Sequence, residues 1–262
     1  MLVVSALQDN ARALTFPVPV AIQDTTMRLL AISTSTPRGS AAVFDGDRLL
    51  GASVYTDLEG HAERIFLAAA EALTAAGVTV ASIEAFACDL GPGSFTGVRV
   101  GVAAAKGMAL GRGAPLVGVG SLEAMAAEAF ASGRAGPADL VLAALDAKKQ
   151  ELFLAAFDQA GAVCWTPRHV PRAEAAALVL AGPGAALPSG GLLRVVGEVV
   201  AEDPALAPYV LRAPTTDLPD AAAVARVALG RLALGGEWDP ELLEPLYVRP
   251  PDAKPMASGG PS

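Results

Sequence analysis

A glycine-rich turn between a largely apolar run and a helix constrains the fold of this chain most strongly. The turn and the start of the helix read Gly-Pro-Gly-Ser-Phe-Thr-Gly-Val-Arg-Val-Gly at residues 91–101. The residues before the turn, Ile83 to Cys88, have the apolar character expected of a buried strand. Glycines permit a tight turn, and Ser94 or Thr96 can cap the helix that follows. We therefore predict a strand, a turn and a helix that covers about residues 97–111.

The predicted helix carries a ridge of small residues. Side chains of little bulk recur at every fourth position, so they lie along one side of the helix. These positions are Gly97, Gly101, Ala105 and Ala109. Glycine inside a helix costs about 1 kcal/mol relative to alanine, so Gly101, Gly107 and Gly111 indicate that another backbone comes close. That backbone belongs either to the protein's own sheet or to a partner, and the turn could also cradle a phosphate. Spacing alone leaves these alternatives open, because the lysine of a P-loop and the full dinucleotide fingerprint are both missing.

The composition is that of an acidic globular protein. The 262 residues carry a formal net charge of −8, and 53% of them are hydrophobic. No apolar run is long enough for a membrane span, and polar residues interrupt the first 26 residues where a signal peptide needs an apolar centre, so we expect a cytoplasmic protein. The negative charge excludes the chain as the main holder of a nucleic-acid backbone. Cys88 and Cys164 lie in apolar runs, and both are expected to be buried, reduced thiols.

Hydrophobic patterning divides the chain into two successive α/β lobes. The first lobe, residues 27–133, is predicted to have the order β-β-β-α-β-α-β-α, and the second lobe, residues 134–249, opens with a similar strand-turn-strand. Residues 1–26 are expected to form an extension, and residues 250–262 a disordered tail rich in proline, glycine and serine. The predicted strands cover residues 28–33, 40–44, 48–55, 83–88, 115–119, 139–145, 151–157, 164–170 and 193–196. The predicted helices cover residues 61–76, 97–111, 173–180 and 221–234, and a further one begins at Ser121.

A hairpin-led unit that recurs within one chain is similar to the duplicated domain of the actin, sugar-kinase and Hsp70 (ASKHA) superfamily. Four motifs resemble the TsaB (YeaZ) family in the same order and spacing. They are Leu30–Thr36, His61–Arg64, Gly91–Gly101 and Gly118–Ala124. Pro245–Arg249 near the end continue the resemblance, which covers residues 27–249 and implies an α/β fold of the ASKHA type.

The resemblance implies a non-catalytic subunit of the bacterial machinery that forms threonylcarbamoyladenosine next to the anticodon of tRNA. The family pairs with its catalytic paralogue TsaD, is joined by the ATPase TsaE, and is expected to form a homodimer when alone, with tRNA contacted only indirectly. No catalytic residue, metal or cofactor is expected. The helices that start at His61 and Gly97 are expected to dock on TsaD, so a bulky residue at Gly101 or Ala105 should block docking and leave the fold intact. The expected partner-binding residues are His61, Glu63, Arg64, Gly97, Val98, Arg99, Gly101, Val102, Ala105 and Ala109.

The sequence departs from the superfamily pattern in its first strand. Ser33 stands where the superfamily usually carries an aspartate that helps to hold a metal-bound nucleotide, and serine cannot supply that charge. Two loops are therefore expected to be vestiges of a nucleotide site. Their residues are Thr34, Ser35, Thr36, Gly91, Gly93 and Ser94. The rival hypothesis is an independent kinase or ATPase in which Asp89 and Asp146, at strand ends, position magnesium. A metal site like that of the catalytic paralogue needs paired histidines, whereas His61 and His169 are far apart in the sequence.

Overall fold

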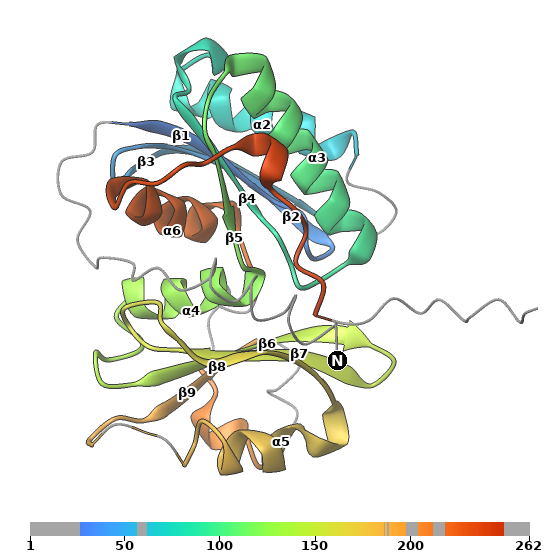
Figure 1. Ribbon diagram of the computed structural model, residues 1–262, viewed down its shortest axis with the longest axis vertical. Coiled ribbons are helices and arrows are strands. Elements are labelled where there is room, and N and C mark those ends of the chain that lie inside the picture. The colour runs from blue at the N-terminus through green and yellow to red at the C-terminus, as the bar shows by residue number, and fades with distance from the viewer. Residues whose placement is uncertain are drawn as a thin grey trace, which may run out of the picture.

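Figure 1 shows the computed structural model, which describes residues 27–56, 62–185, 187, 189–197, 204–211 and 218–248. Sheets and helices alternate in layers, with one sheet in the upper half of this view and the other in the lower half. The predicted extension at residues 1–26, the predicted tail at residues 250–262 and His61 lie outside the described residues.

The first sheet is built around a hairpin meander. β1 (Arg28–Ser33), β2 (Arg38–Asp45) and β3 (Arg48–Thr56) are antiparallel neighbours. β4 (Ala85–Asp89) and β5 (Leu116–Val119) extend the sheet in parallel on the other side of β1, which gives the order β3-β2-β1-β4-β5. The continuous apolar runs of β1 and β4 are explained by helices that cover both faces of the sheet. The predicted order β-β-β-α-β-α-β-α is confirmed.

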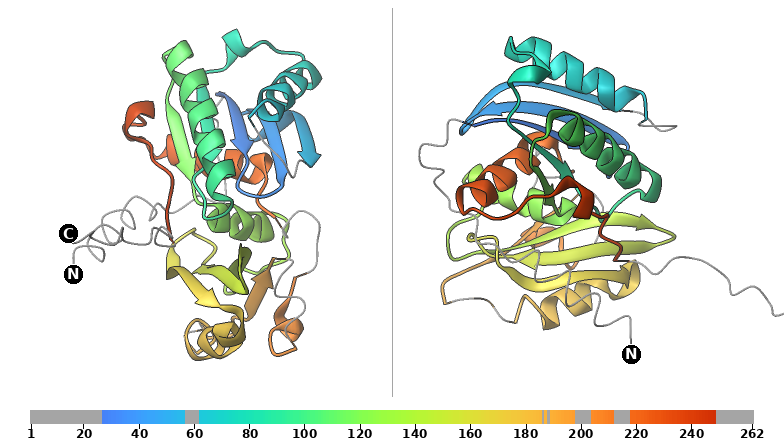
Figure 2. Two further views of the ribbon diagram at one scale, coloured as in Figure 1. Left: turned by 90° about the vertical axis from the view of Figure 1, so that its right-hand side faces the viewer. Right: turned by 45° about the horizontal axis from the view of Figure 1, so that its top comes forward.

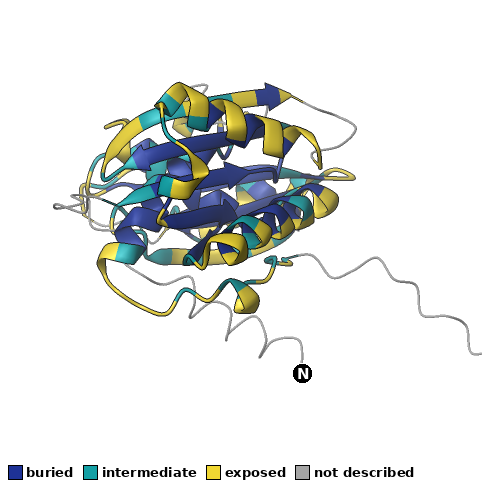
Figure 3. Cartoon of the chain, turned by 90° about the horizontal axis from the view of Figure 1, so that it is seen from above, coloured by how far each residue is buried: buried dark blue, intermediate teal, exposed yellow. Residues whose placement is uncertain are grey.

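Two helices cover the outer face of this sheet. α2 (Arg64–Ala76) packs on β2 and β3, and α3 (Phe95–Arg112) packs mainly on β4 (Figure 2). Gly77 ends α2 in a left-handed conformation, as its position at the end of the predicted helix indicated. α2 and α3 each have buried residues on one side, and Figure 3, seen from above, shows exposed residues along the helices and buried residues along the strands. Among the described helices, none is both long and apolar enough to cross a membrane.

The layer between the two sheets consists of α4 (Ser121–Ala131) and α6 (Ala221–Ala233). α6 packs on the inner face of the first sheet, in a core that includes Leu29 and Phe44. α4 lies beside α6 and packs on the second sheet with its other side. The boundary between residues 133 and 134 stays a prediction, but α6, which the prediction placed with the second lobe, is packed on the first sheet.

The second sheet repeats the meander of the first. β6 (Leu140–Lys148), β7 (Glu151–Phe157) and β8 (Val163–Pro171) are antiparallel neighbours, and β9 (Leu193–Val196) joins β6 in parallel. α5 (Arg172–Ala181) covers the outer face of this sheet. The duplicated α/β architecture expected from the ASKHA resemblance is confirmed.

The two cysteines differ in their surroundings. Cys88 on β4 is completely buried, and burial raises the pKa of its thiol. Cys164 is exposed, because β8 is an edge strand whose residues alternate between partly buried and exposed positions. The prediction of a buried thiol is therefore confirmed for Cys88 and wrong for Cys164.

Candidate functional site

The glycine-rich turn lies against the loop that follows β1. The amide of Ser94 donates a hydrogen bond to the carbonyl oxygen of Ser35 at 2.6 Å, and the hydroxyl of Thr34 donates one to the carbonyl oxygen of Gly97 at 2.8 Å. A Cβ atom built on Gly93 would lie 2.2 Å from the Ser35 oxygen, so only glycine fits there. The two loops predicted to be vestiges of a nucleotide site are thus brought together, and they bind each other.

The first amide groups of α3 are also engaged within the chain. The Ser94 hydroxyl accepts a hydrogen bond from the amide of Gly97, so of the two predicted caps, Ser94 and Thr96, it is Ser94 that caps the helix. A phosphate at a helix N-terminus is held by free backbone amides. Because the amides of Ser94 and Gly97 already have partners, the geometry favours a structural turn over a phosphate cradle.

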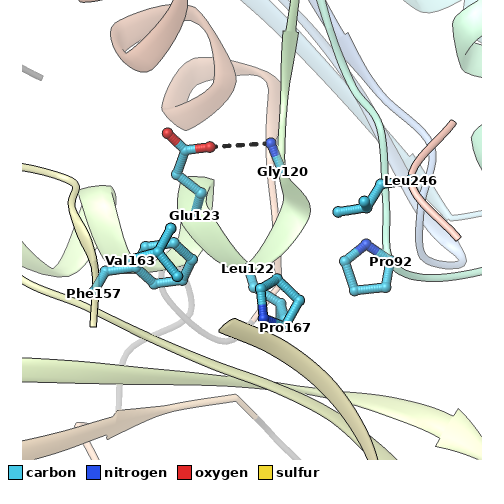
Figure 4. A pocket seen from close by; sticks show the side chains of 8 residues that line it. All are labelled: Pro92, Gly120, Leu122, Glu123, Phe157, Val163, Pro167 and Leu246. Carbon is cyan, nitrogen blue, oxygen red and sulfur yellow. Dashed lines mark hydrogen bonds between the residues drawn. The ribbon is translucent and has the colours of Figure 1, made fainter. Parts of the chain in front are cut away.

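A small pocket lies where the turn meets the second lobe (Figure 4). The space in it that the centre of a water-sized molecule can occupy is about 10 Å³, against the roughly 300–1,000 Å³ typical of small-molecule sites. The lining residues are Pro92, Gly120, Leu122, Glu123, Phe157, Val163, Pro167 and Leu246. Glu123 is the one charged side chain of this lining, and its carboxylate is already engaged by Arg231. The pocket therefore does not fit a nucleotide.

Asp89 ends β4 as predicted, but it is completely buried. Its carboxylate accepts hydrogen bonds from the Ser33 hydroxyl at 2.7 Å, from the Thr34 amide at 3.4 Å and from the Ser121 hydroxyl at 3.5 Å. Burial raises the pKa of the Asp89 carboxyl despite the hydrogen bonds that it accepts. Asp146 instead forms an ion pair with Lys148 in the hairpin between β6 and β7, at 2.9 Å. A magnesium ligand must face the metal and its water, so buried Asp89 does not fit the role that the kinase hypothesis gives it.

The predicted ridge of small residues faces the protein's own sheet. Seven of the residues expected to bind a partner lie between residues 97 and 109, and all of them except Arg99 are buried within the chain. The buried residues are Gly97, Val98, Gly101, Val102, Ala105 and Ala109. A Cβ atom on Gly101 would lie 2.1 Å from the hydroxyl oxygen of Thr34. For this ridge the structure shows tight packing within the chain. The expectation that a bulky residue at Gly101 or Ala105 leaves the fold intact is wrong, because both positions are buried and neither has room for a larger side chain.

The opposite side of α3 is open and also has little bulk. Gly107 and Gly111 are exposed, and a Cβ atom on either would meet nothing within 4 Å. The outer sides of α2 and α3 also expose apolar side chains, namely Phe66 and Leu67 of α2 at 51% and 52% exposure and Leu110 of α3 at 51%. We call this surface the helix-pair face. It consists of Phe66, Leu67 and Ala70 on α2 and of Ala103, Gly107, Leu110 and Gly111 on α3.

The charged residues predicted to bind a partner are exposed at the beginnings of the two helices. Glu63 and Arg64 lie at the start of α2, and Arg99 lies one turn into α3. The guanidinium carbon of Arg99 lies 3.8 Å from the ring centre of Phe95, and its Nε donates a hydrogen bond to the Tyr247 hydroxyl at 2.9 Å. Sequence reasoning missed this contact, because Tyr247 belongs to a C-terminal segment 148 residues away.

A buried ion pair fixes the start of α4 beside the glycine-rich turn. Arg231 of α6 donates hydrogen bonds to both carboxylate oxygens of Glu123, at 2.7 and 2.9 Å, and to the carbonyl oxygen of Gly118. Glu123 in turn accepts a hydrogen bond from the amide of Gly120 at 3.3 Å, as expected of an acidic residue in the first turn. The pair links the last helix to the junction between β5 and α4. Nothing in the local sequence around either residue points to the other.

Two meander-led sheets with helices between and outside them define the class: a two-lobed ASKHA protein whose glycine-rich turn is packed into its own structure. A family model described as TsaD, tRNA N6-adenosine threonylcarbamoyltransferase, matches residues 57–166. The solved structure of YeaZ from Pseudomonas aeruginosa matches with a TM-score of 0.66 at 25% sequence identity, over 84% of this chain and 99% of that chain.

Proteins with related sequences narrow the class to one family. The tRNA threonylcarbamoyladenosine biosynthesis protein TsaB of Escherichia coli K12 is 39% identical over 133 residues, which is 51% of this chain and 56% of the relative. An uncharacterized Mycobacterium bovis protein, Mb3455c, is 34% identical over 234 residues, which is 87% of this chain and 95% of the relative. The chain belongs to the TsaB (YeaZ) family, as its motifs indicated. It spans little more than half the length of the Escherichia coli relative.

Proposed function

We propose that this protein is a non-catalytic subunit of the machinery that forms threonylcarbamoyladenosine in tRNA, and that it acts by docking on TsaD through the helix-pair face. The role in tRNA modification is supported by membership of the TsaB family. The proposed complex also takes up TsaE, and the same face holds a homodimer when TsaD is absent. The protein is proposed to work in the cytoplasm and to contact tRNA only indirectly.

The observation that carries the docking proposal is the pair of exposed glycines on α3. Gly107 lies in the helix interior, where glycine costs about 1 kcal/mol relative to alanine, Gly111 lies in the last turn, and a Cβ atom on either would meet nothing within 4 Å. A partner helix that packs closely on Gly107 and Gly111 would explain why glycine occupies both positions, since helices approach most closely where side chains are small. The exposed apolar side chains of Phe66, Leu67 and Leu110 then gain a dry contact.

The relation to TsaD supports the choice of partner. The TsaD family model matches residues 57–166, which include α2 and α3. A TsaD protein therefore carries elements that correspond to this helix pair. Two such pairs, facing each other, can form a four-helix contact.

The test is reconstitution of tRNA threonylcarbamoylation from purified TsaD, TsaE and the other factors, with and without this chain. Gly107→Leu places bulk into open space on the helix-pair face, so it should weaken TsaD binding at least about tenfold, the equivalent of 1.4 kcal/mol. Ala177→Leu adds similar bulk at an exposed position of α5, away from this face, and should bind like the wild type. ATP turnover by the chain alone, with no effect on the reconstituted reaction, would overturn the proposal.

A further inference from the structure

We propose that Phe95, Arg99 and Tyr247 form an anchor that binds a carboxylate side chain of the docking protein. We call these three residues the arginine-aromatic cluster. The inference rests on the proposed function, because it takes TsaD as the protein that docks. It adds a specific chemical contact to a surface that is otherwise apolar.

The cluster is held in one arrangement by its own contacts. The guanidinium carbon of Arg99 lies 3.8 Å from the ring centre of Phe95 and 5.6 Å from that of Tyr247, and the two rings are 5.8 Å apart. The hydrogen bond from Arg99 Nε to the Tyr247 hydroxyl fixes the orientation of the guanidinium plane. A side chain that is already ordered loses less conformational entropy when a partner binds.

The segment that presents Tyr247 is itself tied down along α3 (Figure 1). The amide of Leu246 donates a hydrogen bond to the carbonyl oxygen of Leu90 at 2.7 Å. Nearer the start of the segment, Lys106 of α3 donates a hydrogen bond to the carbonyl oxygen of Glu241 at 3.1 Å. The cluster therefore combines α3 with the C-terminal end of the described chain, and it is ordered before any partner binds.

The cluster keeps an unused capacity for a carboxylate. Phe95 is 56% exposed and Tyr247 46% exposed, so the cluster is open to solvent. Within the described residues, Arg99 has no carboxylate partner, and Nε is the nitrogen that is engaged. The two terminal nitrogens of a guanidinium match the two oxygens of a carboxylate in a bidentate pair. A carboxylate of the partner therefore completes the site.

A protein is favoured over RNA as the source of this negative charge. The formal net charge of the chain is −8, and the neighbouring segment carries Glu241 and Glu244, which repel a phosphate backbone. Leu242 in the same segment is 79% exposed, so the segment also offers an apolar side chain to a protein partner, and arginine and tyrosine are enriched in binding hot spots between proteins. Arg99 also lies one helical turn before Ala103, so the cluster continues the helix-pair face.

The experiment measures the affinity of the full chain for purified TsaD at low and at high salt. Arg99→Gln should weaken binding about 10- to 100-fold and reduce its salt dependence, because the ion pair is lost. Arg99→Lys keeps the positive charge but lacks the two terminal nitrogens of the guanidinium, so it should bind more tightly than Arg99→Gln and less tightly than the wild type. Tyr247→Phe keeps the ring, removes the hydroxyl that orients the guanidinium, and should weaken binding severalfold. Thermal unfolding of each variant serves as the control for folding.

Three outcomes separate this inference from the docking proposal. If Gly107→Leu prevents binding while Arg99→Gln binds like the wild type with the same salt dependence, the anchor is refuted and docking stands. If the wild-type chain does not bind TsaD, both fail. If Arg99→Gln removes binding of tRNA to the chain alone and leaves the affinity for TsaD unchanged, the cluster is a nucleic-acid contact and the anchor is refuted.

Discussion

Replacing either of two glycines on α3, six positions apart, by alanine should change the stability of the protein in opposite directions. Gly101 faces the loop that follows β1, where a Cβ atom would lie 2.1 Å from the Thr34 hydroxyl oxygen, whereas a Cβ atom on Gly107 meets nothing within 4 Å. Replacement by alanine removes the helix penalty of glycine at both positions, a gain of about 1 kcal/mol. Gly107→Ala is therefore expected to stabilise the protein by about this amount.

At Gly101 the gain is outweighed. The Thr34 hydroxyl must move, so it loses its hydrogen bond to Gly97 and becomes a buried, unsatisfied group at a cost of about 1–3 kcal/mol. Forcing a methyl group into a packed contact costs about 1–3 kcal/mol more. After the helix gain of about 1 kcal/mol is subtracted, Gly101→Ala is expected to destabilise the protein by about 1–5 kcal/mol.

Urea unfolding and thermal unfolding of the two variants and the wild type measure these differences. For a chain of this size, 1 kcal/mol corresponds to a change in Tm of about 2–4 °C. Gly107→Ala should raise Tm by this much, and Gly101→Ala should lower it by at least as much. If Gly101→Ala stabilised the protein as Gly107→Ala does, the ridge would not be packed as described, and the distinction between an inward and an outward face of α3 would fail.

Two further predictions concern buried charges. Burial raises the pKa of the Asp89 carboxyl in the folded state. The stability of the wild type relative to Asp89→Asn should therefore be highest below about pH 4, where the carboxyl is protonated, and should fall as pH rises through the raised pKa. If the free energies of unfolding in urea of the two proteins ran parallel across this pH range, the raised pKa would be contradicted. Arg231→Met leaves Glu123 buried without its cation and should cost about 3–5 kcal/mol. The added change Glu123→Gln should recover part of this loss, and urea midpoints that do not respond to Arg231→Met would show that the pair is not needed.

The secondary structure could be predicted from the sequence because each element carries its own local signal. The run from Ile83 to Cys88 places β4, Ser94 caps α3 and Gly77 ends α2. These signals depend on a few neighbouring residues, and the fold did not override them. β9 at Leu193–Val196 was predicted at its observed bounds for the same reason.

The direction in which an element faces could not be predicted in the same way. α3 has small residues at every fourth position on two of its sides, and spacing alone does not say that Gly101 meets the loop after β1 while Gly107 meets solvent. Contacts between distant segments were also missed. The pair of Glu123 with Arg231 and the contact of Arg99 with Tyr247 depend on where the C-terminal helix and segment return, which only the assembled fold determines.

The return of α6 to the first sheet has a consequence for synthesis on the ribosome. The inner face of that sheet, with Leu29 and Phe44, is covered by a helix that begins at Ala221, about 90 residues after α4 ends at Ala131. At a translation rate of about 5–20 residues per second, that apolar face stays uncovered for roughly 5 to 20 s until α6 has been synthesised. During this interval the nascent chain exposes a surface suited to chaperone binding, and a stalled or truncated product would keep that surface exposed.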